Sequence, residues 1–402
     1  MICFCLGMAC LALLQSVRPL VFAWWGTPGP AVTVTARSLV LTNSVETHVT
    51  PTGTFEYVRL PLGEPDDLLP DVRLPLNPPR WLFSGYSKVK LEAFFRSSEL
   101  TDEQREGLLD AHRWETTPEG ICVTPSLEIV ASLSRRARSQ IYPVLAESPV
   151  NTPQGHPFRF PLGGVPDRLL DARLSAKTVE VFNNLLYADE GTACFADGAV
   201  AQRLLPTQEF KALVSVLYCD PTFLMRLRVS PDTDINKLLH YWSKCGRSRE
   251  LKPLFQSLAR VPGGGAINIE HLLPPFARLR LYTHGLVAPD AAKSRQNCFW
   301  TALNFFSEQP DAQYLNVETV FRALDADYHP VVGERQLGDL VCLLDAKGRP
   351  AHLAVYIVDD VVFTKDGSDN CQPWVLMKIP DMLVEYISKP SLKLVTLRRN
   401  GW

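Results

Sequence analysis

The chain has 402 residues, which is more than one domain of the usual ~100–200 residues, so we expect two or three domains. Hydrophobic residues make up 46% of the chain and charged residues 21%, which excludes a wholly disordered protein. With 41 Lys and Arg against 43 Asp and Glu, the net charge is −2. This balance lacks the basic footprint of a nucleic-acid-binding domain, so we expect no nucleic-acid partner.

The first 17 residues carry no charge and are mostly apolar, and Arg18 and Pro19 interrupt the run. The run is shorter than the ~20 residues that cross the hydrocarbon core of a membrane. It fits the apolar part of an export signal, and Val21 to Ala23 offer a candidate cleavage site. The sequence predicts a signal peptide over residues 1–23 and an exported protein of the periplasm or cell envelope. The alternatives are an uncleaved anchor that tethers the chain to the membrane, and a misassigned start or buried helix.

The cysteines do not form a metal-binding pattern. The chain has ten, and three of them, Cys3, Cys5 and Cys10, precede the candidate cleavage site. The other seven include no C-x-x-C pair, and their spacing matches no zinc motif. We therefore expect neither a metal site nor another cofactor.

A short internal repeat lies in the first half of the chain. Residues 59–74 and 159–174 are identical at nine of sixteen positions without a gap, beginning with R-L-P-L-G and R-F-P-L-G. Each copy leads into helical sequence, so we expect an extended arm plus helices, used twice. The predicted domains are a first repeat over 24–150, a second repeat with further helices over 151–285, and a final domain over 286–402.

Helix caps and periodicity place several helices in residues 24–285. The capping box Thr101 to Gln104 opens a helix to about Trp114, and Thr124 with Pro125 opens another to about Ile141. Five further helices are expected near 177–188, 207–218, 234–244, 249–260 and 268–282. The fold class is therefore α+β, with a duplicated α-rich region before the final domain.

Three arginines share the second of these helices. Arg135, Arg136 and Arg138 could contact an anionic polymer, but a solvated helix face is the favoured interpretation.

The last domain contains the candidate catalytic residues. Residues 297–306 read as a helix with Asn297 as N-cap and an apolar stripe that includes Phe299 and Leu303. Cys298 stands in its first turn, where unpaired N–H groups and the helix dipole favour a thiolate and can hold an oxyanion. Strands are predicted over 338–344, 351–357 and 361–365, with a tight turn at Asp359 and Asp360.

A histidine on the second strand could serve as the base for Cys298. By alternation His352 shares one face with Ala354 and Tyr356, and the small Ala354 leaves room for a partner side chain. Its ring could accept the thiol proton and return it to a leaving amine. A third polar group should then orient the ring; Asp366 is the first choice and Asn370 the weaker one.

This combination resembles the NlpC-like and CHAP-like branch of papain-fold cysteine peptidases and amidases. The resemblance is carried by Asn297 to Trp300, Gly338 to Val341 and His352 to Tyr356, and it covers residues 286–402 only. It implies a helix packed on an antiparallel sheet, with Cys298 as nucleophile and His352 as base. It also implies cleavage of amide bonds in bacterial cell-wall peptides.

Two functions from different classes remain. The first is an exported thiol-dependent amide hydrolase, a cysteine peptidase that acts on cell-wall peptide or another amide. Its catalytic residues would be Cys298, His352 and Asp366. Transfer of the acyl group to an amine instead of water would use the same residues. The alternative is a binding or scaffold protein with an inactive papain-like domain, whose helical repeats carry the interaction. The sequence leans towards the enzyme and does not give the oligomeric state.

Overall fold

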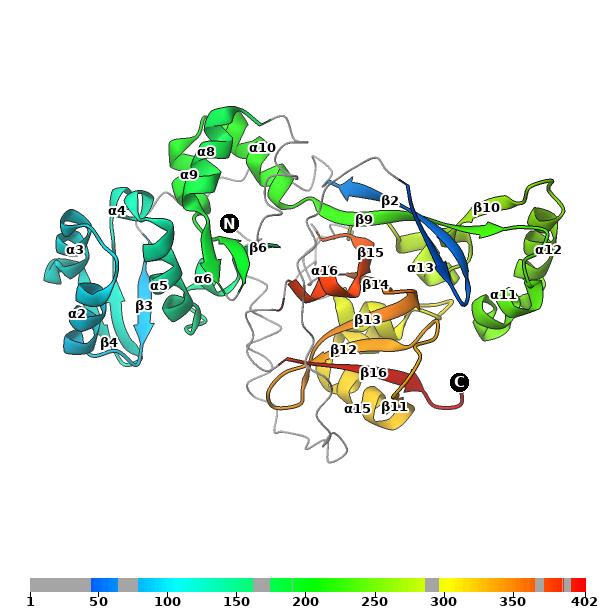
Figure 1. Cartoon of the computed structure of the whole chain (residues 1–402). Coiled ribbons are helices and arrows are strands. Elements are labelled where there is room, and N and C mark those ends of the chain that lie inside the picture. The colour runs from blue at the N-terminus through cyan, green and yellow to red at the C-terminus, as the bar shows by residue number, and fades with distance from the viewer. Residues whose placement is uncertain are drawn as a thin grey trace. The chain divides into compact units, whose positions relative to one another are not determined.

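A computed structural model describes residues 45–63, 79–161, 174–189, 191–285, 296–365, 372–384, 386 and 392–402. The predicted export signal lies outside these residues. The chain forms two compact units, which are treated one at a time: unit 1 holds the described residues between 79 and 217, and unit 2 holds 45–63 together with those from 218 onward. Both units mix helices with antiparallel sheets, so the chain is α+β (Figure 1). The two units divide the chain differently from the predicted boundaries after residues 150 and 285.

Unit 1 begins with a three-stranded sheet and its helices. The elements are β3 (Trp81–Ser84), α2 (Lys88–Ser97), α3 (Asp102–Leu109), β4 (Trp114–Thr117), β5 (Gly120–Val123), α4 (Leu127–Ser132), α5 (Arg135–Ala146) and α6 (Thr152–Gly155). The capping box predicted at Thr101 is present, with both its hydrogen bonds. The helix ends at Leu109, earlier than expected, because the chain turns through a short 3₁₀ helix into β4.

The rest of unit 1 repeats this order of strands. Its elements are β6 (Phe158–Pro161), α8 (Ala176–Leu185), β7 (Tyr187–Asp189), β8 (Thr192–Phe195), α9 (Gly198–Leu204) and α10 (Thr207–Leu217). The two sheets have the orders β3-β5-β4 and β6-β8-β7, so in each the last strand lies in the middle. We call the two parts modules. In each, a strand is followed by helical residues, then a hairpin, then two helices, and the first module ends with the additional four-residue helix α6 (Figure 1).

A buried arginine joins the two modules and corrects one prediction. Arg138 is fully buried, and its Nε donates to Asp197 Oδ2 at 2.7 Å. Arg138 also donates to the carbonyls of Val130 and Leu133, where α4 ends. The single helix expected over 124–141 is in fact two helices, α4 and α5. The prediction that Arg138 lies on a solvated helix face is wrong, because the side chain is buried.

The sequence repeat occupies two different settings. In the first copy, residues 59–62 belong to β2, which pairs with β9 in unit 2; in the second, residues 159–161 belong to β6, which pairs with β8 in unit 1. Most of the remaining repeat lies outside the described residues. Arg59 stacks over Phe223 at 5.0 Å, whereas Arg159 pairs with Asp189 at 3.0 Å. The described parts of the two copies are therefore not equivalent structures.

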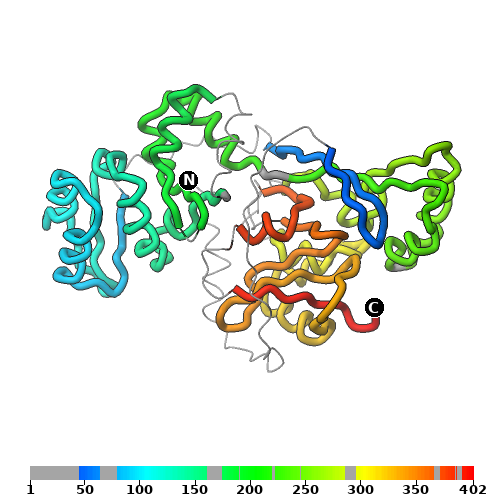
Figure 2. Tube along the Cα trace, viewed as in Figure 1, coloured from blue at the N-terminus to red at the C-terminus, as the bar shows by residue number. Residues whose placement is uncertain are grey.

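Unit 2 opens with a four-stranded sheet of order β1-β2-β9-β10. Its elements are β1 (Glu46–Thr50), β2 (Gly53–Leu62), β9 (Asp220–Val229), α11 (Ile235–Trp242), α12 (Ser248–Ala259), β10 (Gly265–Asn268) and α13 (Pro275–Arg280). Figure 2 shows β2, in blue, running beside β9, in green. The helix expected over 268–282 is broken: a 3₁₀ turn ends at His271, and α13 begins anew at Pro275, with Pro274 at its N-cap position. The α-rich expectation missed the ten strands β1 to β10, which lie within the described part of residues 45–285.

The remainder of unit 2 is a six-stranded antiparallel sheet of order β11-β16-β12-β13-β14-β15. Its strands are β11 (Tyr328–Pro330), β12 (Leu340–Leu344), β13 (Pro350–Val358), β14 (Val361–Lys365), β15 (Trp374–Lys378) and β16 (Lys393–Arg399). Its helices are α14 (Cys298–Leu303), α15 (Val317–Asp327) and α16 (Ile379–Val384). The three strands predicted in this domain are confirmed, as is the turn at Asp359 and Asp360. The predicted helix is also present, but it ends at Leu303, earlier than expected.

Candidate functional site

Cys298 is the first residue of α14, as predicted. The Asn297 side chain caps the helix by accepting a hydrogen bond from the Trp300 backbone N at 3.0 Å. Cys298 is only 7% exposed, and every other residue of the helix up to Ala302 is also buried. The helix therefore presents its sulfur to the interior of unit 2 and not to an open groove.

Three observations identify the face of the six-stranded sheet that α14 covers. The indole Nε1 of Trp374 donates to Thr301 Oγ1 at 2.9 Å, and the rings of Phe305 and Phe363 lie 5.6 Å apart. Burial raises the pKa of the Cys342 thiol, and the nearby Cys298 raises it further. The residues Cys342, Phe363 and Trp374 point to this face, which we call the cysteine face.

His352 lies on the other face of the same sheet. It is fully buried and pairs in register with Leu343, next to the pair Val341 and Ala354. The core on this face, which we call the histidine face, is formed by Val341, Leu343, Ala354, Tyr356, Val362, Val375, Met377, Ile379 and Met382.

Two side chains of the histidine face hold the imidazole ring. Nε2 of His352 lies 3.0 Å from Thr364 Oγ1, and Nδ1 lies 2.8 Å from the Tyr386 hydroxyl. Thr364 pairs with Val375, and Tyr386 packs against the same core. Both ring nitrogens therefore take part in hydrogen bonds within the core.

The structure does not bring Cys298 and His352 to the same face of the sheet. Cys342 pairs in register with Leu353, and neighbouring residues of a strand point to opposite faces, so His352 points away from the cysteine face. Asp366 and Asn370, the two candidates for the orienting group, lie outside the described residues.

Reasoning from sequence missed the two residues that hold His352. Thr364 could have been found, because strand alternation places it on the same face as Val362, whereas Phe363 faces the other way. Tyr386 lies beyond the last predicted strand, and no spacing in the sequence connects it with His352. The sequence also gave no sign that Lys365 would be buried on the cysteine face, with its Nζ 5.5 Å from the Trp374 ring centre.

A second group of polar side chains surrounds the turn between β13 and β14. Asp359 Oδ2 accepts from the Tyr57 hydroxyl at 3.1 Å and lies 2.9 Å from His48 Nδ1. Asp359 has a φ of 60°, which is unusual for a residue other than glycine. These contacts fasten β1 and β2 to the six-stranded sheet, and none of the three residues was among the predicted site residues.

Over the described ranges, no three His, Cys, Asp or Glu side chains are placed to hold a metal ion. Nor is any helix in this part of the chain both long and apolar enough to span a membrane.

No family model, curated protein or solved structure matches this chain significantly.

Proposed function

We propose that this protein is a binding or scaffold protein whose final domain does not act as a Cys/His hydrolase. The observation that carries the proposal is the placement of Cys298 and His352 on opposite faces of one sheet. A general base must come within hydrogen-bonding reach of the proton that it removes. A sheet between thiol and imidazole prevents that contact, so the resemblance to papain-fold hydrolases extends to sequence motifs but not to this pair.

The burial of both groups supports the same proposal. His352 is fully buried among the side chains of the histidine face, and Cys298 is nearly so on the cysteine face. A nucleophile must be reached by its substrate, and buried structural cysteines are typically inert. His352, held by Thr364 and Tyr386, has the arrangement of a core histidine whose polar atoms are satisfied within the fold.

The architecture of unit 1 supports the role of a scaffold. Its two modules share one order of strands, and the buried contact between Arg138 and Asp197 ties the first module to the second. Repeated modules that pack on one another build extended surfaces, which many proteins use for binding. We propose unit 1 as the interaction part. Cell-wall peptide is the partner class we favour, because the predicted export signal would bring the chain to the cell envelope.

Alkylation of individual cysteines tests the absence of a Cys/His pair. We would treat the full chain with iodoacetamide between pH 5.5 and 9.5 and follow each cysteine peptide by mass spectrometry. Cys298 should react more slowly than the half-buried Cys219 at every pH, and only under alkaline conditions. His352→Gln should leave this profile unchanged, with His329→Gln, at an exposed position, as the matched control. Circular dichroism would verify that each variant is folded.

Rapid labelling of Cys298 below pH 7 that disappears in His352→Gln would overturn the proposal. A second readout is incubation with peptidoglycan fragments, in which the wild type and Cys298→Ala should give the same products. Cleavage of the fragments by the wild type but not by Cys298→Ala would support the hydrolase hypothesis instead.

A further inference from the structure

A hollow lies beside the C-terminal end of α14, away from Cys298. Its cavity volume is about 110 Å³, and part of it is open to solvent. Its walls come from α14 and the residues after it, from β11, from the start of β12 and from the end of β16. The lining residues are Ala302, Leu303, Phe306, Ser307, Tyr328, Gly338, Leu340, Arg399 and Trp402.

One wall of the hollow is aromatic. The rings of Phe306 and Trp402 meet edge to face, with centroids 4.6 Å apart. Gly338 makes this contact possible, because a Cβ at its position would lie 2.5 Å from Phe306 and 2.9 Å from Trp402. Its φ of 93° also favours glycine. A flat apolar group could therefore pack against these two rings.

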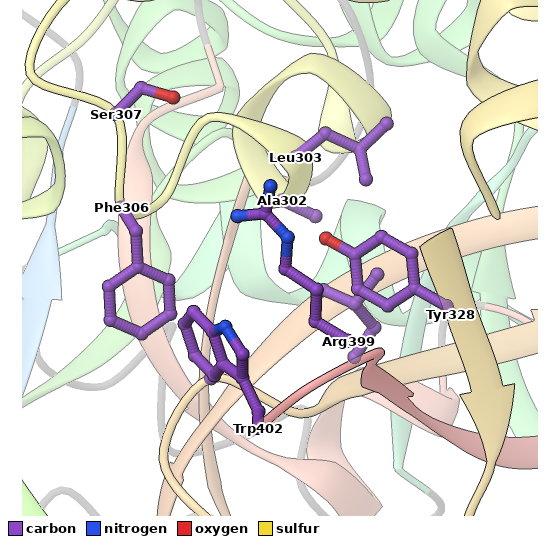
Figure 3. Close-up of a pocket in the computed structure, with 9 residues that line it drawn as sticks. Ala302, Leu303, Phe306, Ser307, Tyr328, Arg399 and Trp402 are labelled. Atoms are coloured by element: carbon purple, nitrogen blue, oxygen red, sulfur yellow. The ribbon is translucent and has the colours of Figure 1, made fainter. Parts of the chain in front are cut away.

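The opposite wall supplies a positive charge and a hydroxyl. Figure 3 shows the Arg399 guanidinium and the Tyr328 hydroxyl on one side of the hollow, and Phe306 and Trp402 on the other. Burial raises the pKa of Tyr328 to about 12, so its hydroxyl stays protonated at neutral pH and can donate. In the described part of the chain Arg399 makes no ion pair, although Arg398, its neighbour in sequence, pairs with Asp339 at 2.7 Å.

A second cation strengthens the positive character of this region. The Nζ of Lys244 lies 5.8 Å from the centre of the Trp402 ring. Of the two cations only Arg399 lines the hollow, and Arg binds carboxylates with two parallel hydrogen bonds, so the hollow favours an anion.

We propose that this hollow binds a small carboxylic acid with an aromatic or apolar body. The carboxylate is held by Arg399 with the Tyr328 hydroxyl, and the body packs against Phe306 and Trp402. The same chemistry occurs in a free acid and in the last residue of a peptide. The site lies entirely in unit 2 and does not depend on the role proposed for unit 1.

The test uses 3-phenylpropionate with the full chain. Binding is followed by NMR at the indole N–H of Trp402, which is assigned by its loss in Trp402→Phe. We expect a dissociation constant of about 1 mM or lower. The uncharged analogue 3-phenylpropionamide should bind at least about tenfold more weakly, because it lacks the charge-assisted bonds.

Two arginine variants separate the site from general electrostatics. Arg399→Gln should weaken binding of 3-phenylpropionate at least about tenfold. Arg322→Gln removes the same charge from an exposed position on α15 outside the hollow and should leave affinity within about twofold. Equal affinity for the acid and its amide, or unchanged binding in Arg399→Gln, would overturn the proposal, as would no binding at all.

Two peptides decide the source of the carboxylate. Gly-Gly-Phe with a free C-terminus and the same peptide with a C-terminal amide are titrated in the same way. Binding of the free peptide but not of the amide extends the site to peptide ends. Binding of 3-phenylpropionate without either peptide assigns it to free acids. None of these binding measurements depends on Cys298. Failure of the carboxylate site can therefore be told apart from failure of the proposed function, which the alkylation experiment tests.

Discussion

Asp197 in unit 1 and Asp359 in unit 2 each bind side chains from distant parts of the sequence, and the two carboxylates differ in burial. In unit 1, Asp197 is almost completely buried and is bonded by Arg138 and Tyr142. In unit 2, the Asp359 side chain is 27% exposed and is bonded by Tyr57 and His48. Both arrangements combine a tyrosine hydroxyl with a nitrogen donor.

The difference shows how burial determines the contribution of a carboxylate and its partners to the stability of the fold. Removing one partner from a buried ion pair leaves a charge without compensation in a poorly solvated place, which costs several kcal/mol. At a partly exposed turn, water replaces a lost partner, and the same change costs little. Asp197 therefore acts as a fixed joint between the modules, whereas Asp359 contributes less to the stability of its turn.

The largest expected effect is at Arg138. Arg138→Met keeps much of the side-chain volume but leaves Asp197 without its cation, and we expect the free energy of unfolding to fall by about 3–5 kcal/mol. The control is Arg136→Met on the same helix. Arg136 is 81% exposed and lies 3.5 Å from Glu99, so its loss should cost less than about 1 kcal/mol. Urea denaturation measures both variants; equal losses would show that the buried pair is not a joint.

Two tyrosine variants sharpen the comparison. The Tyr142 hydroxyl lies 2.7 and 2.8 Å from the two oxygens of Asp197, so Tyr142→Phe should cost about 1.5–3 kcal/mol. Tyr57→Phe removes a single 3.1 Å bond to a carboxylate that water can reach, and should cost about 0.5–1 kcal/mol. Thermal unfolding of both variants shows which one loses more stability. A larger loss for Tyr57→Phe than for Tyr142→Phe would contradict the prediction.

The smallest effect is a gain in stability at Asp360. Burial raises the pKa of this carboxyl above its ordinary 3.8, with Lys378 opposing the shift and Asp359 adding to it. Since the folded state then holds the proton more tightly, ionisation lowers stability as the pH rises through the folded-state pKa. Asp360→Asn should therefore be more stable than the wild type at pH 7, and the difference should vanish below about pH 3.8.

Chemical denaturation across pH 3 to 8 measures the effect of Asp360→Asn. Asp325→Asn, on the exposed side of α15, removes a carboxylate in the same unit and serves as the control. A variant that is less stable than the wild type at pH 7 would mean that the contact between Lys378 and Asp360, 3.9 Å apart, outweighs the cost of burial.

The sequence predicted local structure well where a local signal exists. The capping box at Thr101 and the N-cap at Asn297 both begin helices, and the turn at Asp359 joins two strands. Such features depend on residues a few positions apart, so they are visible without a fold. The helix break after Ser132 was missed, although Ser134 caps the next helix by accepting from the Ala137 backbone N. The buried Arg138, which donates to the carbonyls of Val130 and Leu133, could not be foreseen from local sequence.

The candidate site could not be predicted in the same way. Alternation along β13 correctly grouped His352 with Ala354 and Tyr356. It could not say which face of the sheet α14 would cover, because that depends on contacts such as Trp374 with Thr301, 73 positions apart. The sequence motifs therefore identified Cys298 and His352 as candidates, but they could not show whether the two residues lie on the same face of the sheet.

The pairing of β2 with β9 has a consequence for synthesis of the chain. Leu60 is opposite Thr222 in this ladder, so unit 1 is inserted between two parts of unit 2. When β2 leaves the ribosome, its partner strand is still about 160 residues away, a delay of roughly 8–30 s at ordinary translation rates. Unit 1 can fold during this interval, while β2 has an unpaired edge and is open to capture by a chaperone.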